Sequence, residues 1–281
     1  EKTMSGNQAY ILRLRIYQPQ AHYRVPFAYQ RRHTYPIPPY STVIGFLCNV
    51  LGYDGMPSDH EQLKKLKISI AGRFESKTTE YTWYRNLSKS AHVDRFGAIE
   101  NRSIGGRIEH IGGQSPILID VLNEVHLVIH LAHEDRSFLE LIRSSLENPI
   151  RRLEILHLGR AEDWIVIEEL SEIRELSTLE VCRVDADFRH FFWIPECLYL
   201  PEGMEGVSDF NCYEGLRYRL PTFWTVENYA TTRNRHGRRI FEYMTVKLSN
   251  GLFKEKKFLF DKDDKKCSLP VFLANFGGGY E

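Results

Sequence analysis

The stretch YPIPPYSTVIGFL, Tyr35 to Leu47, decides how the N-terminal half of this 281-residue chain is interpreted. Its three prolines keep the backbone extended, because each proline also disfavours helix at the residue before it. Ser41 then offers a favourable N-cap, and Gly52 stands where a C-terminal glycine belongs. The pattern predicts a helix over residues 42–51 whose first turn presents free N–H groups to an anion.

Gly45 stands in the second turn of this helix, where glycine costs about 1 kcal/mol relative to alanine. Such a cost is tolerated where a neighbouring backbone or a ligand comes close to the helix. Close packing of the helix on a sheet is the favoured interpretation, and the approach of a ligand is the alternative.

The segments on either side predict an α+β fold. Residues 10–17 (YILRLRIY) alternate apolar and polar side chains, which predicts a half-exposed strand with Arg13 and Arg15 on a basic outer face. A loop over residues 18–40 separates this strand from the helix. The apolar patterns predict further strands at 67–75, 117–131 and 164–170, and helices at 59–66 and 137–146. This order over residues 10–170 is typical of ferredoxin-like or RRM-like domains.

Two regions depart from this order. Residues 76–116 combine the strand-like TEYTWYRN with five glycines and few apolar residues, which predicts an inserted β-hairpin thumb or arm. An ordinary surface loop is the alternative for this segment. Residues 176–281 predict a smaller β-rich C-terminal lobe, with a hairpin of 240–248 and 257–260 around Asn250-Gly251. We therefore expect a main domain over residues 8–175 that carries the arm, followed by this lobe.

Charge is balanced overall but uneven along the chain. The 37 Lys and Arg residues equal the 37 Asp and Glu residues in number, yet residues 1–50 hold six basic residues and one acid. Residues 134–175 hold eleven acids and six Arg. The separation predicts a basic face for phosphates and an acidic face for another partner.

Five scattered cysteines contain no C-x-x-C pair, so we expect free thiols rather than a zinc site or a disulfide framework. No apolar run approaches the roughly 20 residues of a membrane span, and the sequence contains no signal peptide. We therefore expect a cytoplasmic protein that does not contact a membrane.

Two motifs resemble one family. The Arg- and aromatic-rich loop that leads into TYPIPPYSTVIGFLCNVLG (34–52) resembles the CRISPR-associated protein 5 family of the RAMP superfamily. The segment HLGRAED (157–163) resembles that family's LGR-x-ED signature. The resemblance implies a ferredoxin-like domain with a thumb, which grips the 5′ handle of the CRISPR RNA at the foot of the type I complex Cascade. It also implies contacts with the backbone subunit and the large subunit, close to the target DNA.

The loop and the resemblance together give a set of candidate RNA-binding side chains. They are basic, aromatic or hydroxyl-bearing residues of the loop, the helix start, the thumb and two later segments: Arg24, Arg31, Arg32, His33, Tyr35, Tyr40, Ser41, Thr42, Arg85, Arg107, Arg160, Arg233, Arg235, Arg238 and Arg239. Sheet packing is an equal alternative for Tyr35 and Tyr40. An ion pair with Glu162 or Asp163 is the alternative for Arg160, and a solvated loop is the alternative for the last four arginines.

An enzyme is the rival function, because one branch of the resembled family cleaves precursor CRISPR RNA without a metal. His22, His33 and Tyr35 lie in sequence beside Arg31 and Arg32, which supplies a possible base and a cation for the developing phosphorane. Loop histidines are more often surface residues that form hydrogen bonds. We therefore expect a non-catalytic subunit without a cofactor, with a metal-independent endoribonuclease as the alternative.

Two further classes have less support. A generic RNA-recognition module would show an aromatic strand of the form G-F-G-F-V-x-F, which is absent from the sequence. A metal enzyme would need more than His126 and His130, because no pair of carboxylates completes a site with them.

Overall fold

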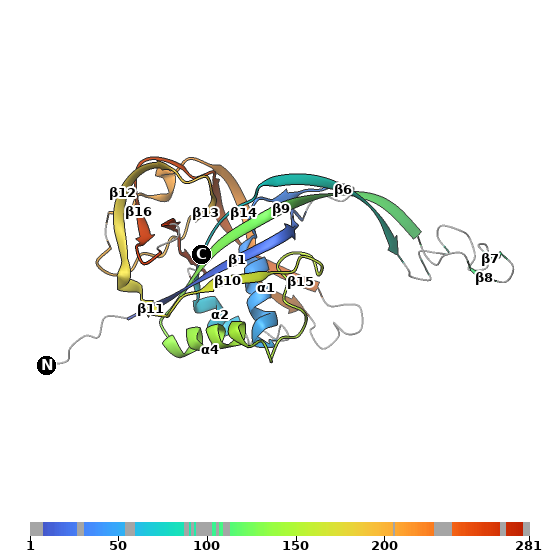
Figure 1. Ribbon diagram of the computed structural model, residues 1–281, viewed down its shortest axis with the longest axis horizontal. Helices are drawn as coiled ribbons and strands as arrows, with labels where there is room; N and C mark the ends of the chain where they lie inside the picture. The colour runs from blue at the N-terminus through green and yellow to red at the C-terminus, as the bar shows by residue number, and fades with distance from the viewer. Residues whose placement is uncertain are drawn as a thin grey trace.

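A large, mainly antiparallel sheet carries the α+β fold, with helices on one side of it and a small second sheet on the other (Figure 1). The computed structural model describes residues 8–26, 31–53, 60–86, 90, 93, 103–104, 107–108, 113–204, 206–227, 238–264 and 268–277. In chain order its helices and strands are β1 (Tyr10–Ala21), β2 (Tyr23–Arg24), β3 (Arg31–Arg32), β4 (Thr34–Tyr35), α1 (Tyr40–Leu51), α2 (His60–Lys65), β5 (Lys67–Arg73), β6 (Ser76–Asn86), β7 (Ser103–Ile104), β8 (Arg107–Ile108), β9 (Gly113–His133), α4 (Arg136–Glu147), β10 (Val166–Leu170), β11 (Arg174–Glu175), η3 (Leu176–Thr178), β12 (Leu179–Asp187), β13 (Phe191–Pro195), η4 (Phe210–Cys212), β14 (Leu216–Glu227), β15 (Arg238–Ser249), β16 (Leu252–Asp261), β17 (Pro270–Val271) and β18 (Ala274–Asn275). The strands predicted at 67–75, 117–131 and 164–170 and the helices predicted at 59–66 and 137–146 are confirmed as β5, β9, β10, α2 and α4.

The main sheet is organised around β9. Its strands run in the order β10-β1-β9-β5-β13-β15-β14, with antiparallel pairing along this path. The second half of β9 lies between β1 and β5, whereas its first half pairs with β6 from Asn86↔Gly113 to Ser76↔Asn123. We call this ribbon of β6 and residues 113–123 of β9 the arm. The arm projects away from the rest of the sheet (Figure 1).

Both faces of β1 are buried, because a layer packs on each side of it. Leu12, Leu14 and Ile16 belong to the main core together with apolar side chains of α1 and α4. Ile11 belongs to a second cluster with Leu259 of β16 on the opposite face. A small sheet with the strand order β12-β16-β17 covers that face. Full burial of one Leu or Ile side chain contributes about 1.5–3 kcal/mol, so both layers stabilise the strand.

The predicted basic outer face of β1 is therefore wrong. Arg13 and Arg15 are only 5% and 9% exposed, because the small sheet and its connections lie over them. The Arg13 guanidinium donates to Asp261 Oδ2 at 2.5 Å and to Glu169 Oε1 at 2.7 Å. Arg15 donates to Glu169 Oε2 at 3.0 Å and also to Asp264. Both arginines neutralise enclosed carboxylates and are not available to phosphates.

Helix α1 confirms the predicted helix but begins two residues earlier, at Tyr40. The expectation that Ser41 caps the helix is wrong, since Pro39 is the N-cap residue and its backbone is already extended. No side chain forms a capping hydrogen bond with the first turn. Gly52 ends the helix with a φ of 75°, as predicted. A Cβ at Gly52 would lie 2.5 Å from the carbonyl oxygen of Arg151, so only glycine fits there.

The expected loop over residues 18–40 is partly strand. β1 continues to Ala21, and β2 pairs with β4 through Tyr23↔Tyr35. β3 then lies parallel to β9, with Arg31 beside Leu118 at the base of the arm. The segment thus folds back along the sheet, which brings Arg31 to the arm.

Strands from the C-terminal part of the chain complete the main sheet. β13 pairs with β5, and β15 lies between β13 and β14. The predicted hairpin of residues 240–248 and 257–260 is wrong, because β16 pairs with β12 and β17 rather than with β15. Asn250 and Gly251 instead carry the chain from one sheet to the other, and Gly251 has a φ of 86°. The division of the chain near residue 175 remains a prediction.

Candidate nucleic-acid interface

The base of the arm gathers three basic side chains around one buried carboxylate. Asp120 of β9 lies opposite Thr79 of β6 and accepts a hydrogen bond from the Thr79 hydroxyl at 3.0 Å. His33 Nδ1 lies 3.1 Å from Asp120 Oδ2. Lys77 Nζ and Arg31 Nη2 approach the same carboxylate at 3.5 Å and 3.6 Å. We call these five residues the arm-base cluster.

The electrostatics of this cluster favour an anion. Burial raises the pKa of the Asp120 carboxyl, but hydrogen bonds from Thr79 and His33 and the charges of Lys77 and Arg31 outweigh it, so the pKa is lowered overall. The ionised carboxylate holds the basic side chains in place while each of them stays about half exposed. One buried negative charge therefore positions two permanent positive charges at the surface, which suits a phosphate.

Two large aromatic side chains continue the same face of the arm. Tyr81 and Trp83 are 61% and 53% exposed, and their rings meet edge to face at 5.9 Å. Alternate residues of a strand share a face, so both rings follow Thr79 on the side of the arm-base cluster. Their cross-strand neighbours are Leu118 and Pro116. Exposed rings of this kind stack on unpaired bases, and each stacked base contributes about 1–3 kcal/mol.

Sequence reasoning missed Tyr81, Trp83, Lys77 and Asp120. The signal for the two rings was present, because TEYTWYRN places Tyr81 and Trp83 two positions apart, on one face of a largely polar strand. Lys77 and Asp120 gave no such signal. They come together only through the register of β6 against β9, which spacing along the chain does not determine.

The other predicted arginines near the arm have mixed positions. Arg32 Nη1 donates to the hydroxyl of Tyr84 at 2.8 Å, and its guanidinium carbon lies 4.2 Å from the centre of that ring. This contact ties β3 to β6. Arg24 of β2 is exposed. By backbone position, Arg85 belongs to β6, Arg107 to β8, and Arg238 and Arg239 to the start of β15. Arg233 and Arg235 lie outside the described residues. Their contacts with RNA remain predictions.

Tyr35 and Tyr40 are buried in the core. The Tyr35 ring meets Trp193 and Tyr218 edge to face at 5.7 Å and 5.8 Å. The Tyr40 ring meets Phe276 at 5.4 Å. Burial raises the pKa of both hydroxyls. Packing, the alternative considered for these residues, describes both of them, and neither ring offers a face to a base.

Ser41 and Thr42 lie half-buried in the first turn of α1, at a groove of about 450 Å³. Leu153 and His157, from the connection between α4 and β10, line the same groove. The residues that line it include no member of the arm-base cluster. The two hydroxyls therefore belong to a different surface from the cations of the arm.

The HLGRAED segment folds around the buried carboxylate of Asp163. This carboxylate accepts hydrogen bonds from the backbone N–H of Arg160 at 2.8 Å and of His22 at 2.9 Å. It also accepts one from the Arg160 guanidinium at 2.8 Å. Arg160 Nη1 lies 3.4 Å from Glu80 of β6. The ion pair considered as the alternative for Arg160 is thus present, and it braces the root of the arm.

Of the side chains considered for RNA cleavage, His33 and Arg31 lie together at the Asp120 carboxylate, whereas His22 and Tyr35 are buried. His22 is buried, with Nδ1 2.7 Å from the carbonyl oxygen of Asp120, and burial lowers its pKa. Tyr35 faces the core, as described above. His33 is the exposed member of the three, and its Nδ1 is held by the Asp120 carboxylate. Among the described residues, no group of three or more His, Cys, Asp or Glu side chains could hold a metal ion.

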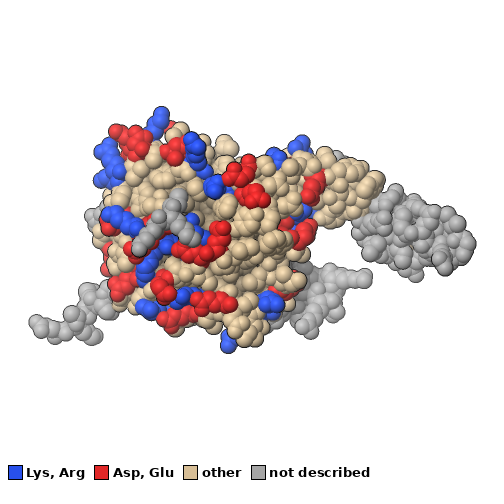
Figure 2. All heavy atoms as spheres, viewed as in Figure 1, with Lys and Arg blue, Asp and Glu red and all other residues tan. Residues whose placement is uncertain are grey.

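The expected separation into a basic and an acidic face is not seen on the side of the molecule in Figure 2, where both signs lie next to each other. Local ion pairs explain part of this mixing, such as Arg143 with Glu172 at 2.9 Å.

Within the described part of the chain, no helix is long and apolar enough to cross a membrane.

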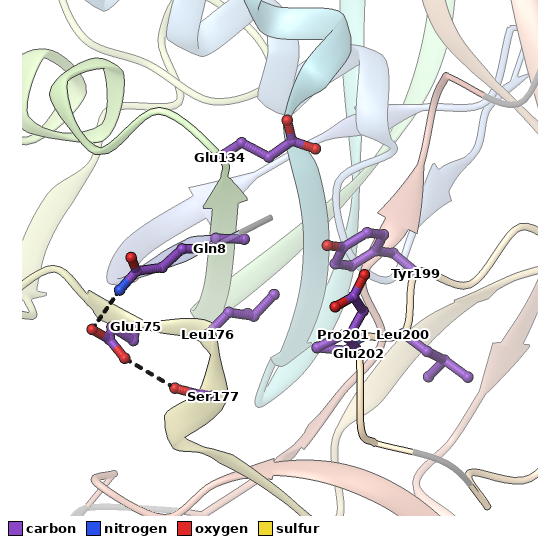
Figure 3. A pocket seen from close by; sticks show the side chains of 10 residues that line it. Gln8, Glu134, Glu175, Leu176, Ser177, Tyr199, Leu200, Pro201 and Glu202 are labelled. Carbon is purple, nitrogen blue, oxygen red and sulfur yellow. Dashed lines mark hydrogen bonds between the residues drawn. The ribbon is translucent and has the colours of Figure 1, made fainter. Parts of the chain in front are cut away.

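A hollow of about 330 Å³ at the start of β1 is acidic, in contrast to the basic arm-base cluster (Figure 3). Glu134, Glu175 and Glu202 line it together with Tyr199. Burial, and then the charges of Glu134 and Glu202, raise the pKa of the Tyr199 hydroxyl. Three carboxylates repel a phosphate, so this hollow is not a place for a nucleic-acid backbone.

Comparisons with known proteins identify a family. The family model for CRISPR-associated protein (Cas_Cas5) matches residues 11–254. A search of curated proteins found no match to this chain. Among solved structures, the chain resembles a "CRISPR RNA-guided surveillance complex" chain with 13% identity and a TM-score of 0.48, covering 89% of this chain and 91% of that one. It resembles a second chain, from "Crystal structure of Cas protein", with 15% identity and a TM-score of 0.43, covering 85% and 92%. The assignment rests on the family model, and by that match the chain belongs to the CRISPR-associated protein family Cas_Cas5.

Proposed function

We propose that this chain is a non-catalytic RNA-binding subunit of a type I CRISPR surveillance complex and holds the 5′ handle of the CRISPR RNA. Its membership of the Cas_Cas5 family supports a role in a CRISPR complex. In this role it contacts the backbone subunit and the large subunit of the complex, close to the target DNA.

The observation that carries the proposal is the composition of one face of the arm. Tyr81 and Trp83 expose their rings next to Lys77 and Arg31, whose positions are fixed by the buried Asp120. A single-stranded RNA is held by phosphate contacts and by stacking of its unpaired bases. The arm offers both kinds of contact on one surface, with the cations at its base and the rings farther out.

A ferredoxin-like core is part of the proposal. The four core strands over residues 10–170 are, in chain order, β1, β5, β9 and β10. In the sheet they run β10-β1-β9-β5, so the fourth strand lies beside the first and the third lies between the first and the second. α1 follows the first of these strands and α4 follows the third, and both helices contribute to the same hydrophobic core. This arrangement supports the ferredoxin-like reading, with the arm inserted between β5 and the second half of β9.

The test is a binding titration with the purified chain. A fluorescein-labelled RNA carrying the repeat-derived handle is compared with a scrambled RNA of equal length and composition, and fluorescence anisotropy gives the Kd of each. We expect Tyr81→Ala with Trp83→Ala to weaken binding of the handle RNA by tenfold or more, because each lost stack is worth about 1–3 kcal/mol.

A matched control replaces two exposed side chains far from the arm in sequence, Leu216→Ala with Leu252→Ala. These changes should leave the Kd within twofold of the wild type. Equal effects of the arm pair and the control pair, or no preference for the handle over the scrambled RNA, would refute the proposed function.

Cleavage of precursor CRISPR RNA is a second candidate, favoured by one contact. The exposed His33 ring is oriented by a buried carboxylate, as a general base often is. The discriminating assay incubates the chain with labelled repeat RNA in EDTA and resolves the products on a denaturing gel. We expect intact RNA. Cleavage at one site that is lost in His33→Ala would replace the binding role with the enzymatic one.

A further inference from the structure

A row of apolar side chains is exposed on the connection between α4 and β10. Ile150 and Ile155 are 81% and 74% exposed, and the other exposed members are Leu153, Trp164 and Val166. An isolated bridge between His157 and Trp164 joins the two ends of this connection. The connection lies beside α1 on the helical side of the sheet (Figure 1). We call Ile150, Leu153, Ile155, Trp164 and Val166 the apolar row.

The backbone under this row is firmly held although its side chains are in solvent. The Asn49 side chain of α1 accepts hydrogen bonds from the N–H groups of Leu153 at 3.0 Å and Glu154 at 2.8 Å, and donates to the carbonyl of Ile155 at 3.4 Å. The left-handed Gly52 leaves room for the Arg151 carbonyl at the end of the same helix. The exposed side chains are therefore presented by a preorganised segment, which lowers the entropic cost of binding a partner.

The apolar row continues into the groove beside α1. Leu153 and His157 form one wall of this groove, and Gly45, Phe46 and Asn49 of α1 form the other. A Cβ at Gly45 would have no heavy atom within 4 Å. Neither close packing nor a near backbone explains this helical glycine, so the favoured sequence interpretation is wrong. The missing side chain leaves open space that a protruding side chain of a partner would fill.

The chemistry of the surface indicates which partner fits. Four of the five members of the apolar row are aliphatic and have no π face on which a base could stack, so a protein is favoured over RNA. Arg151 and Arg152 are exposed between Ile150 and Leu153, and neither has an acidic partner among the described residues. Their charges complement a protein segment that carries Asp or Glu beside its apolar side chains.

We propose that the apolar row and the adjoining groove form a docking surface for another protein subunit of the same CRISPR complex. The subunit inserts an apolar side chain above Gly45 and pairs its carboxylates with Arg151 and Arg152. Large exposed apolar side chains beside a groove are typical of interaction sites. The inference rests on the proposed role in a complex, but it concerns a surface separate from the RNA-binding face of the arm.

Two variants test the surface without disturbing the fold. Ile155→Asp changes an exposed side chain, and Gly45→Met fills the groove while it improves the helix propensity of α1. The matched control is Leu252→Asp, which places the same charge on an exposed leucine outside the row. Each tagged chain is co-expressed with the CRISPR RNA and the other protein subunits of its complex. Native mass spectrometry then gives the subunits retained, and anisotropy gives the RNA affinity of each isolated chain.

We expect both variants to lose at least tenfold in occupancy of one protein subunit, with circular dichroism unchanged and RNA affinity within twofold of the wild type. Leu252→Asp should assemble normally. Normal assembly of both variants would overturn the docking surface and leave the proposed function standing. A tenfold loss of RNA affinity, or loss of a wild-type dimer of the isolated chain, would assign the row to RNA or to a second copy instead. Failure of the wild-type chain to enter any particle would overturn the proposed function itself.

Discussion

Replacing Asp261 with Asn is expected to lower the free energy of unfolding by about 3 kcal/mol. Asp261 lies at the end of β16 with no exposed surface, and its Oδ2 accepts hydrogen bonds from Arg13 at 2.5 Å and Arg174 at 2.7 Å. Loss of one partner from a buried ion pair costs about 3–5 kcal/mol. We expect the lower end, because Arg13 keeps Glu169 and Arg174 keeps Asp263 as partners.

The same carboxylate gives the effect a pH dependence. Burial raises the pKa of Asp261, but hydrogen bonds from His130 and Arg174 and the charge of Arg13 outweigh it and leave the pKa far below its usual range. A carboxyl in the unfolded chain titrates near pH 3.9, so the carboxylate form stabilises the fold above that pH and its contribution is lost as pH falls further. The difference between wild type and Asp261→Asn should therefore be full at pH 7 and shrink below about pH 4.

Urea denaturation of both proteins, followed by far-ultraviolet circular dichroism at pH 7 and at pH 3.5, measures the difference. Glu140→Gln is the control, because Glu140 forms an exposed i,i+4 ion pair with Arg136 at 2.9 Å. That change should cost no more than about 0.5 kcal/mol. If Asp261→Asn costs no more than Glu140→Gln at pH 7, the charges between the two sheets are solvated and the reasoning fails.

Three further changes follow from the arm and the loops around it. Arg31→Ala with Arg32→Ala should weaken RNA binding and reduce the slope of log K against log salt by about 1–2, measured by anisotropy at several salt concentrations. Gly159→Ala should lower the melting temperature by several degrees, because Gly159 has a φ of 120° and a Cβ would lie 2.7 Å from Asp163 Oδ2. Replacing residues 80–113 with a short turn should leave a cooperative thermal transition and impair assembly with CRISPR RNA, and loss of folding would show that the arm is part of the core.

The sequence predicted the elements whose signal is local. The prolines before α1, the glycine at its end and the alternation in β1 and β9 each act within a few residues, so those elements were placed correctly. The position of the N-cap moved from Ser41 to Pro39, because an extended proline can itself occupy the cap position. Both Pro39 and Ser41 are residues that can stand at a helix N-cap. The burial of Tyr40 agrees with the earlier start of the helix.

Predictions from the sequence were wrong where burial or strand pairing depends on residues far away in the chain. Arg13 and Arg15 alternate with apolar residues as on any half-exposed strand, and nothing near them indicates that Asp261 and Asp264 arrive from almost 250 positions later. The turn at Asn250-Gly251 has the composition of a hairpin turn, yet the strands on either side belong to different sheets. Turn residues indicate that the chain changes direction, but they do not determine which strands then pair with each other.

The two family motifs act mainly as scaffolding for the arm, which changes how their residues are best interpreted. Asp163 of the HLGRAED segment binds the N–H of His22, and His22 Nδ1 in turn contacts the carbonyl of Asp120, the residue that holds Arg31, His33 and Lys77. The proline-rich stretch carries Tyr35 into the core directly after those basic residues, which fixes the end of the loop. Contacts among buried residues thus fix the positions of Arg31, His33 and Lys77.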